Sequence, residues 1–172
     1  MQGAKSVVTL AVILLTTITL VADKVTSDFD HAVDFSQFRT YMWIQEPNGA
    51  GPLMKNRIVS YVDNQLQIRG LRLVNDGADL AVGANVATEL RHTWETYYSG
   101  DGWGWGGSIW ATTTEKTYEV GTLTVDLFDV QTKRLVWEGI ATDTLSYKPA
   151  KQTKNYAKQV EKMFKGFPPV AR

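Results

Sequence analysis

The stretch LAVGANVATELRHTWE, residues 80–95, places its larger apolar side chains on alternate positions. A period of two is typical of a strand that buries one face of a sheet and leaves the other in water. One face carries Leu80, Val82, Ala84, Val86, Leu90, His92 and Trp94, and the other carries Asn85, Glu89, Arg91 and Glu95. We therefore expect a long, half-buried antiparallel strand. The rest of the chain must supply its neighbouring strands and the layer that covers its apolar face.

Three further strands are predicted around this one. Residues 117–129, TYEVGTLTVDLFD, and residues 135–144, LVWEGIATDT, are rich in β-branched and aromatic side chains. The short polar segment 130–134 separates them, so a hairpin is expected. An earlier strand is predicted at residues 40–44, which stop at the turn-forming EPNG of residues 46–49.

Two segments have the periodicity of amphipathic helices. The first begins near Pro52, repeats apolar residues every four positions, and ends before Gly70. The second carries its apolar stripe on Tyr156, Val160, Met163, Phe164 and Phe167. Each helix has one apolar face, and both faces are buried most simply on the same side of the sheet. We expect an α+β two-layer sandwich: an antiparallel sheet of about four strands with two helices on one face, in the order β-α-β-β-β-α.

The first 22 residues have the pattern of an export signal. Residues 1–5 form a short lead with one basic residue, and residues 6–22, SVVTLAVILLTTITLVA, are apolar and uncharged. This order predicts either a signal peptide that is cleaved or an N-terminal anchor that is retained. Residues 23–172 are enough for a single domain with one core. We expect an exported protein, located in the periplasm or associated with the membrane of the cell envelope.

The composition excludes several kinds of chemistry. Cysteine is absent, which excludes disulfides, thiolate metal sites and a cysteine nucleophile. The chain has 18 Lys plus Arg and 18 Asp plus Glu, so no net positive charge favours nucleic acid. The glycine-rich stretch lacks the Lys-Ser/Thr of a phosphate-binding loop. We expect no nucleic-acid partner and no cofactor, and electrostatic contacts must be local.

Residues 97–110, YYSGDGWGWGGSIW, interleave five glycines with three tryptophans between two predicted strands. Indole rings can stack on sugars or settle at a membrane interface, and this makes Trp103, Trp105 and Trp110 candidate contact residues. The alternative is a hairpin tip whose tryptophans fold back onto the sheet, or a disordered insertion.

A second candidate surface is a row of lysines on the last predicted helix. The row consists of Lys151, Lys154, Lys158, Lys162 and Lys165. At 100° per residue it lies opposite the apolar stripe of that helix and faces outward. Such a row can meet anionic lipid headgroups or another polyanion. The alternative is an ordinary solvated helix face.

Patterns for metal binding and catalysis are weak. Asp28, Asp30, His31 and Asp34 lie close together in SDFDHAVDFS, but this segment lacks the glycine and the further oxygens of a calcium loop. We therefore expect no metal. His92 shares its face with Leu90 and Trp94, which favours a partly buried structural histidine. No spacing identifies a Ser/His/Asp triad.

Four acidic residues on predicted strands can pair as acid and base only if the fold brings them together: Glu89, Glu95, Glu119 and Asp126. We therefore expect a noncatalytic binding or structural module of the periplasm or envelope. Its expected partner is an envelope protein, a glycan or an anionic membrane surface. The alternative is a small periplasmic hydrolase with a carboxylate or Ser/His site.

Several of these motifs taken together resemble domain-of-unknown-function family 4136. They are residues 25–43 (VTSDFDHAVDFSQFRTYMW), 78–80 (ADL), 121–129 (GTLTVDLFD), 135–139 (LVWEG) and 164–169. The family occurs in bacterial envelope proteins that are often lipoproteins, so the resemblance implies an envelope location and an α+β fold. It implies no established activity and no site residues. This chain differs in having Ala22-Asp23 where a lipid-bearing cysteine is expected.

Overall fold

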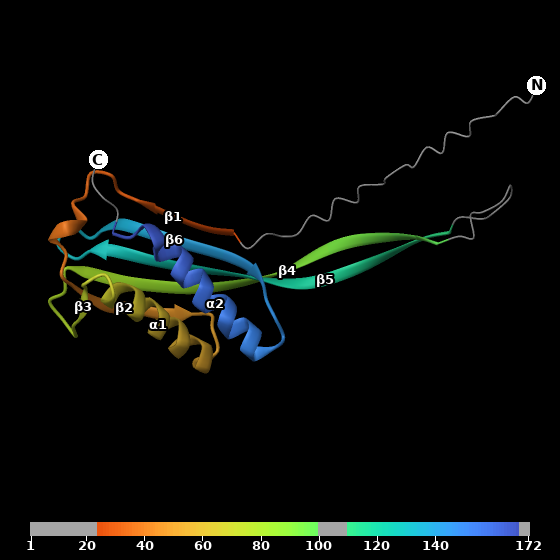
Figure 1. Ribbon diagram of the computed structural model, residues 1–172, viewed down its shortest axis with the longest axis horizontal. Helices are drawn as coiled ribbons and strands as arrows, with labels where there is room; N and C mark the ends of the chain where they lie inside the picture. The colour runs from red at the N-terminus through yellow and green to blue at the C-terminus, as the bar shows by residue number, and fades with distance from the viewer. Residues whose placement is uncertain (1–23, 100–109, 169–172) are drawn as a thin grey trace, which may run out of the picture.

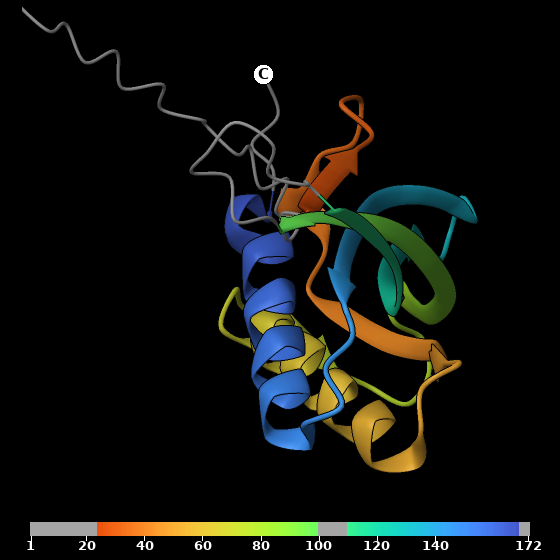
Figure 2. The same cartoon turned by 90° about the vertical axis from the view of Figure 1, so that its right-hand side faces the viewer.

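The computed structural model describes residues 24–99 and 110–168, which form a sheet layer and a helix layer. Both helices cover the same face of the sheet (Figures 1 and 2). The elements are β1 (Lys24–Phe29), β2 (Thr40–Asn48), α1 (Pro52–Gln67), β3 (Arg72–Leu73), β4 (Leu80–Ser99), β5 (Trp110–Asp129), β6 (Arg134–Thr144) and α2 (Pro149–Met163), with short 3-10 helices at Phe35–Gln37 and Phe164–Gly166. The expected α+β architecture is confirmed. No helix within the described residues is long and apolar enough to cross a membrane.

The sheet is larger and more mixed than expected. Its six strands lie in the order β1-β6-β5-β4-β2-β3, and the four predicted strands are all among them. β4, β5, β6 and β1 pair antiparallel, as expected, whereas β2 pairs parallel with β4 and with β3. The parallel pairing arises because α1 carries the chain back across the sheet between β2 and β4. The two added strands, β1 and β3, are the sheet edges, and they lack apolar alternation because most of their side chains are exposed.

The core lies between the helices and one face of the sheet. Leu80 of β4 and Leu123 of β5 are both fully buried. The apolar stripes of the helices meet this face through Ile58, Val62 and Leu66 of α1 and through Tyr156, Val160 and Met163 of α2. The alternation predicted for residues 80–86 therefore corresponds to a buried face.

The two halves of β4 differ in how many neighbouring strands they have. β4 and β5 pair along their whole length, from Leu80 opposite Asp129 to Ser99 opposite Trp110. β2 pairs with β4 only as far as Asn85, and β6 pairs with β5 only from Val120 onward. Residues 88–99 and 110–119 therefore form a two-stranded ribbon, here called the arm, which projects from the body (Figure 1).

The arm overturns one expectation about β4. Leu90 and Trp94 are 63% and 66% exposed, and His92 is exposed between them. The sequence pattern predicts a half-buried strand throughout, but neither of the described helices α1 and α2 covers the arm, as Figures 1 and 2 show. His92 is therefore a surface residue and not the partly buried histidine that was expected.

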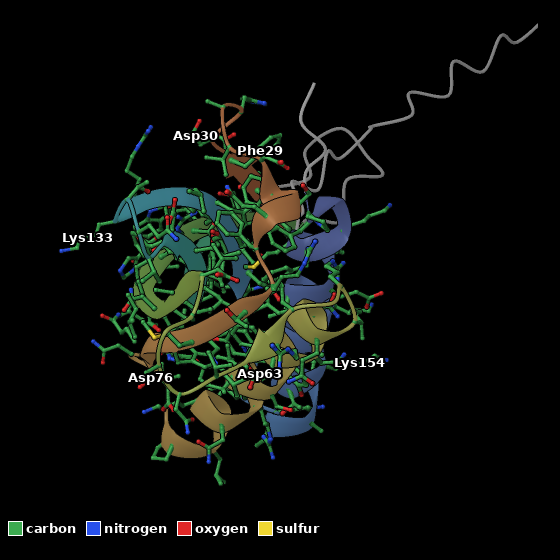
Figure 3. The ribbon with its side chains drawn as sticks, turned by 90° about the vertical axis from the view of Figure 1, so that its left-hand side faces the viewer. Phe29, Asp30, Asp63, Asp76, Lys133 and Lys154 are labelled. Carbon is green, nitrogen blue, oxygen red and sulfur yellow. The ribbon has the colours of Figure 1, made fainter. Side chains whose placement is uncertain are left out.

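Two carboxylates fix the position of β2. Asp79 Oδ2 accepts hydrogen bonds from the backbone N–H groups of Arg39 and Thr40, at 2.8 and 2.9 Å, and from the Thr40 hydroxyl at 3.0 Å. The backbone N–H of Arg39 contributes most to lowering the pKa of Asp79. On α1, Asp63 (labelled in Figure 3) accepts two hydrogen bonds. Its Oδ1 accepts from Tyr41 Oη at 2.8 Å and from Trp43 Nε1 at 2.9 Å. These bonds join β2 to its neighbours in both layers.

Candidate functional site

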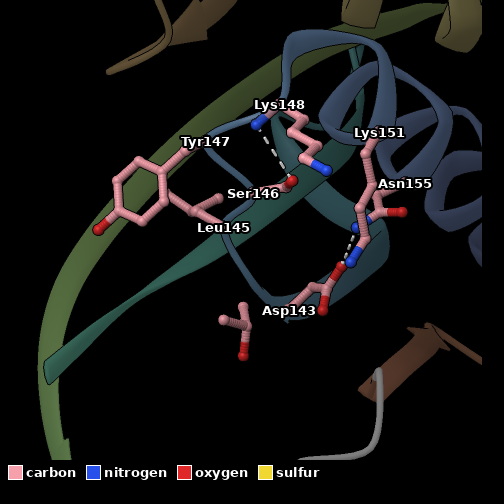
Figure 4. A pocket seen from close by; sticks show the side chains of 8 residues that line it. Asp143, Leu145, Ser146, Tyr147, Lys148, Lys151 and Asn155 are labelled. Atoms are coloured by element: carbon pink, nitrogen blue, oxygen red, sulfur yellow. Dashed lines mark hydrogen bonds between the residues drawn. The ribbon is translucent and has the colours of Figure 1, made fainter. Parts of the chain in front are cut away.

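An open cleft of about 620 Å³ lies where β6 ends and α2 begins (Figure 4). The chain leaves the sheet after Thr144 and starts the helix at Pro149, so the short connecting segment 145–148 forms one wall. The residues that line the cleft are Asp143, Thr144, Leu145, Ser146, Tyr147, Lys148, Lys151 and Asn155. The sequence had singled out Lys151 among these.

Hydrogen bonds fix three of the polar side chains in this cleft, those of Asp143, Ser146 and Asn155. Asp143 Oδ2 accepts from Asn155 Nδ2 at 2.8 Å and from Gln159 Nε2 at 3.3 Å. The Ser146 hydroxyl accepts from the backbone N–H of Lys148 at 3.3 Å. Two amide donors therefore hold the one carboxylate of the cleft as an acceptor, an arrangement suited to binding and positioning.

The electrostatics of the cleft favour an anionic group. Its lining includes the ammonium groups of Lys148 and Lys151 and a single carboxylate, Asp143. The first turn of α2 contains no acidic residue, and its N-cap makes no side-chain hydrogen bond. The partial positive charge of a helix N-terminus adds to that of the lysines.

The five lysines of the predicted row are all exposed along the outer side of α2 and its extension. Lys151 reaches the cleft, and Figure 3 shows Lys154 on the outside of the helix. The opposite stripe of the helix is buried, as the spacing predicts. A ligand for this row stays a prediction.

The tryptophans lie elsewhere. Trp103 and Trp105 are outside the described residues, and Trp110 is the first residue of β5, paired with Ser99 at the far end of the arm. Ten residues separate Trp110 from Val120, where β6 begins to pair. At about 3.3 Å per residue the backbone of Trp110 is roughly 33 Å farther along the strand. The structure therefore does not bring Trp110 together with the lysine row.

Neither histidine lines the cleft. His31 packs against Phe29 with ring centroids 4.3 Å apart, and His92 Nδ1 lies 2.7 Å from Glu115 Oε1 on the arm. Within the described residues no group of three His, Asp or Glu side chains could hold a metal ion.

The acidic strand residues are also dispersed. On the arm, Glu89 pairs with Arg91, and Glu95 pairs with Lys116. Asp126 lies in the body, where burial and then the charge of Glu138 raise its pKa. Glu119 lines a different cavity, at the base of the arm. The fold therefore does not bring these four acidic residues together as an acid and base pair.

Two exposed residues on the arm were missed as candidate contacts, Leu90 and Trp94. The sequence signal that could have revealed their exposure was the length of the alternating pattern in residues 80–95. Strands in globular proteins usually have about 3–10 residues, whereas β4 and β5 have 20 each. A strand of this length extends past the neighbours that could cover it.

The fold and cleft define a two-layer α+β domain with an open site at the base of a projecting ribbon. By comparison with known families, the chain belongs to DUF4136, described as a domain of unknown function, which matches residues 25–169. A search of curated proteins found no match.

The solved structures that match this chain share little sequence with it. A PDZ domain protein from Parabacteroides distasonis is 15% identical with a TM-score of 0.58, over 85% of this chain and 35% of that one. This chain therefore spans about a third of that protein, and the likeness shows the fold alone. A PelC dodecamer from Paraburkholderia phytofirmans is 17% identical with a TM-score of 0.47, over 83% of this chain and 96% of that one. A putative neuraminyllactose-binding hemagglutinin homolog from Helicobacter pylori is 10% identical with a TM-score of 0.42, over 83% and 92%.

Proposed function

We propose that this protein is a noncatalytic binding module of the bacterial cell envelope that contacts a partner protein through its arm. The observation that carries the proposal is the exposure of Leu90 and Trp94, at 63% and 66%, on one face of the arm. The envelope location rests on the export pattern of residues 1–22.

Few contacts within the described part of the arm stabilise a ribbon of this length. An isolated two-stranded ribbon is marginally stable in water. Its side-chain contacts include the Thr96–Thr113 hydroxyl pair at 3.0 Å and the His92–Glu115 pair at 2.7 Å, both of which are exposed. A partner that covers Trp94 would supply apolar burial that the described side chains of the arm lack, and tryptophan is enriched among the residues that dominate binding energy.

The charge of the arm favours a protein over an anionic membrane. Its described strands carry four carboxylates, Glu89, Glu95, Glu115 and Glu119, against the two cations Arg91 and Lys116. The net charge of 2 − 4 = −2, with histidine neutral, would be repelled by anionic headgroups. A protein surface with an apolar groove and a basic rim would complement it.

The alternative of a small hydrolase has less support. The Asp143 carboxylate of the cleft accepts from two amides. Neither histidine lines the cleft to act as its base. A carboxylate in that setting is suited to holding a donor in place.

The proposal can be tested by placing a photoreactive amino acid at Trp94 of the full chain and irradiating living cells. We expect one adduct of defined mass, recovered with the envelope fraction, that is lost when Leu90→Ser is added. The matched control carries the photoreactive residue at Ile68, which is equally exposed at 66% but lies at the end of α1. Absence of an adduct at position 94, or the same adduct at position 68, would overturn the proposal.

A further inference from the structure

A second cavity, of about 250 Å³, lies at the base of the arm, where Glu119 is paired with Leu90 across the two strands. Four segments far apart in the sequence line it: the turn into α1, the start of the arm in β4 and β5, the segment after β6, and the first turns of α2. The lining residues are Gly49, Ala50, Gly51, Met54, Val86, Thr88, Glu119, Leu145, Ser146, Tyr147, Gln152 and Tyr156.

The turn into α1 can form a wall of this cavity because Gly49 has no side chain. Its φ is +84°, and a Cβ at this position would lie 2.0 Å from the backbone oxygen of Val86. Glycine allows both the left-handed backbone and the close approach to β4. The N-cap of α1, Gly51, makes no side-chain hydrogen bond, so the first N–H groups of the helix have no side-chain cap beside the cavity.

The most informative side chain in the cavity is Gln152. It is 8% exposed, and its Oε1 accepts from the backbone N–H of Ser146 at 2.6 Å. Its Nε2 is buried and makes no hydrogen bond of normal geometry with the described part of the chain. The neighbouring Tyr156 is also buried; burial raises the pKa of its hydroxyl, and a side-chain hydrogen bond from the Gln152 amide partly opposes that rise. The amide group has two N–H donors, and the Tyr156 hydroxyl can accept from one of them. A buried donor without an acceptor is costly, so the second N–H favours an acceptor supplied by a ligand.

The other polar groups differ in character from Gln152. Glu119 contributes a carboxylate, which is an acceptor, and Thr88 and Ser146 contribute hydroxyls. Met54, Val86 and Leu145 supply apolar surface. Tyr147 lies at the rim and is 84% exposed. The cavity therefore combines one buried donor, one charged acceptor, several hydroxyls and an exposed aromatic ring.

We infer that this cavity binds an N-acetylated amino sugar. Its acetamido carbonyl accepts from Gln152 Nε2, its acetamido N–H donates to Glu119, and its methyl group packs on the apolar wall. The ring hydroxyls bond with Thr88 and Ser146, and the apolar face of the sugar stacks on Tyr147. The volume suits one sugar ring, because sites for drug-sized ligands begin at about 300 Å³.

Gln152 needs a hydrogen-bond acceptor from the ligand and Glu119 needs a donor, and an acetamido group supplies both. A carboxylate or phosphate ligand would satisfy Gln152 but would be repelled by Glu119. A plain hexose offers only hydroxyls, which accept less well than an amide carbonyl. A peptide offers the same amide group but lacks hydroxyls for the remaining wall, so it is the competing outcome of the test.

The test is a titration of isotope-labelled protein with N-acetylglucosamine, in which NMR records the chemical shifts of the backbone amides. We expect shifts confined to the lining residues, with millimolar affinity, and at least tenfold weaker binding of glucose and of N-acetylglycine methylamide. Gln152→Glu keeps the acceptor for the Ser146 N–H but removes the donor, and Glu119→Gln removes the charged acceptor. Each is expected to weaken binding about tenfold, the effect of losing one hydrogen bond.

Gln131→Glu is the matched control, because Gln131 lies in the exposed turn between β5 and β6. It is expected to bind as the native chain does, and dispersed spectra confirm that each variant is folded. The inference is overturned if N-acetylglucosamine causes no shifts, if the peptide amide or glucose binds equally well, or if both folded site variants bind without loss. None of these outcomes affects the cross-linking test at Trp94.

Discussion

Leu80 and Leu90 are the same residue type on the same strand and the same face, yet one is fully buried and the other is 63% exposed. At Leu80, β4 lies between β2 and β5 and beneath the helix layer. At Leu90 it has β5 as a neighbour, opposite Glu119, within the arm. Alternation predicts which side chains share a face of a strand, but cover by another layer determines whether that face is buried.

The body and the arm also differ in how they are stabilised. The body buries apolar side chains from both layers in one cluster. The arm depends on backbone pairing between two strands and on exposed polar pairs, each of which contributes roughly 0–1 kcal/mol. Substitutions in the two regions should therefore have very different effects, and the predictions below test this difference.

The largest effect is expected for Leu80→Ala in the body. Removing a fully buried leucine leaves a cavity between β4 and the helices. This should lower the free energy of unfolding by about 2–5 kcal/mol. Urea denaturation followed by circular dichroism measures the change. A loss below about 1 kcal/mol would show that the body is not packed as described.

A smaller effect is expected for Asp79→Asn, at the junction of β2 and β4. The carboxylate accepts three hydrogen bonds from Arg39 and Thr40. Hydrogen bonds to a charged group contribute about 1.5–3 kcal/mol, and Asn retains part of this because it keeps one acceptor oxygen. We therefore expect a loss of about 1–2 kcal/mol near neutral pH.

The same carboxylate predicts a dependence on pH. The pKa of Asp79 is lowered in the folded state from its ordinary value of 3.8. Its stabilisation is therefore fully present above pH 3.8 and is lost as pH falls from there toward the lower folded-state value. Denaturation measured across this acid range should show a shallower decline for Asp79→Asn than for the native chain. Identical slopes would contradict this role of Asp79.

The smallest effect is expected for Leu90→Ala in the arm. The side chain is 63% exposed, so the free energy of unfolding should change by less than about 0.5 kcal/mol. The same denaturation assay measures it beside Leu80→Ala. A loss approaching that of Leu80→Ala would mean that the arm is covered in the isolated protein, and the contrast between arm and body would fail.

The main elements were predictable because their signals are local. The β-branched and aromatic content of residues 117–129 and 135–144 indicated the second part of β5 and most of β6, and the helical spacing of apolar residues indicated α1 and α2. β1 was missed because KVTSDF is a mostly exposed edge strand whose pairing comes from β6, more than a hundred residues later. Its position depends on backbone hydrogen bonds, which leave no periodic trace in the side chains.

The candidate sites were less predictable for the same reason. Lys151 was visible as part of a spaced row, but its place beside Asp143 depends on the turn between β6 and α2. Gln152 and Glu119 carry no motif, and they line one cavity only because the segment after β6 places the first turns of α2 near the base of the arm. Sites assembled from separate segments require the tertiary structure to be recognised.

The sequence by itself determined the α+β class, the faces of the helices and strands, and the family, because periodicity and short motifs are written along the chain. The tertiary structure alone decided the parallel pairing of β2, the projection of the arm and the cavity around Gln152. These features depend on which distant segments cover one another. Burial is a property of neighbours in space, so identical leucines ten residues apart on one strand have opposite environments.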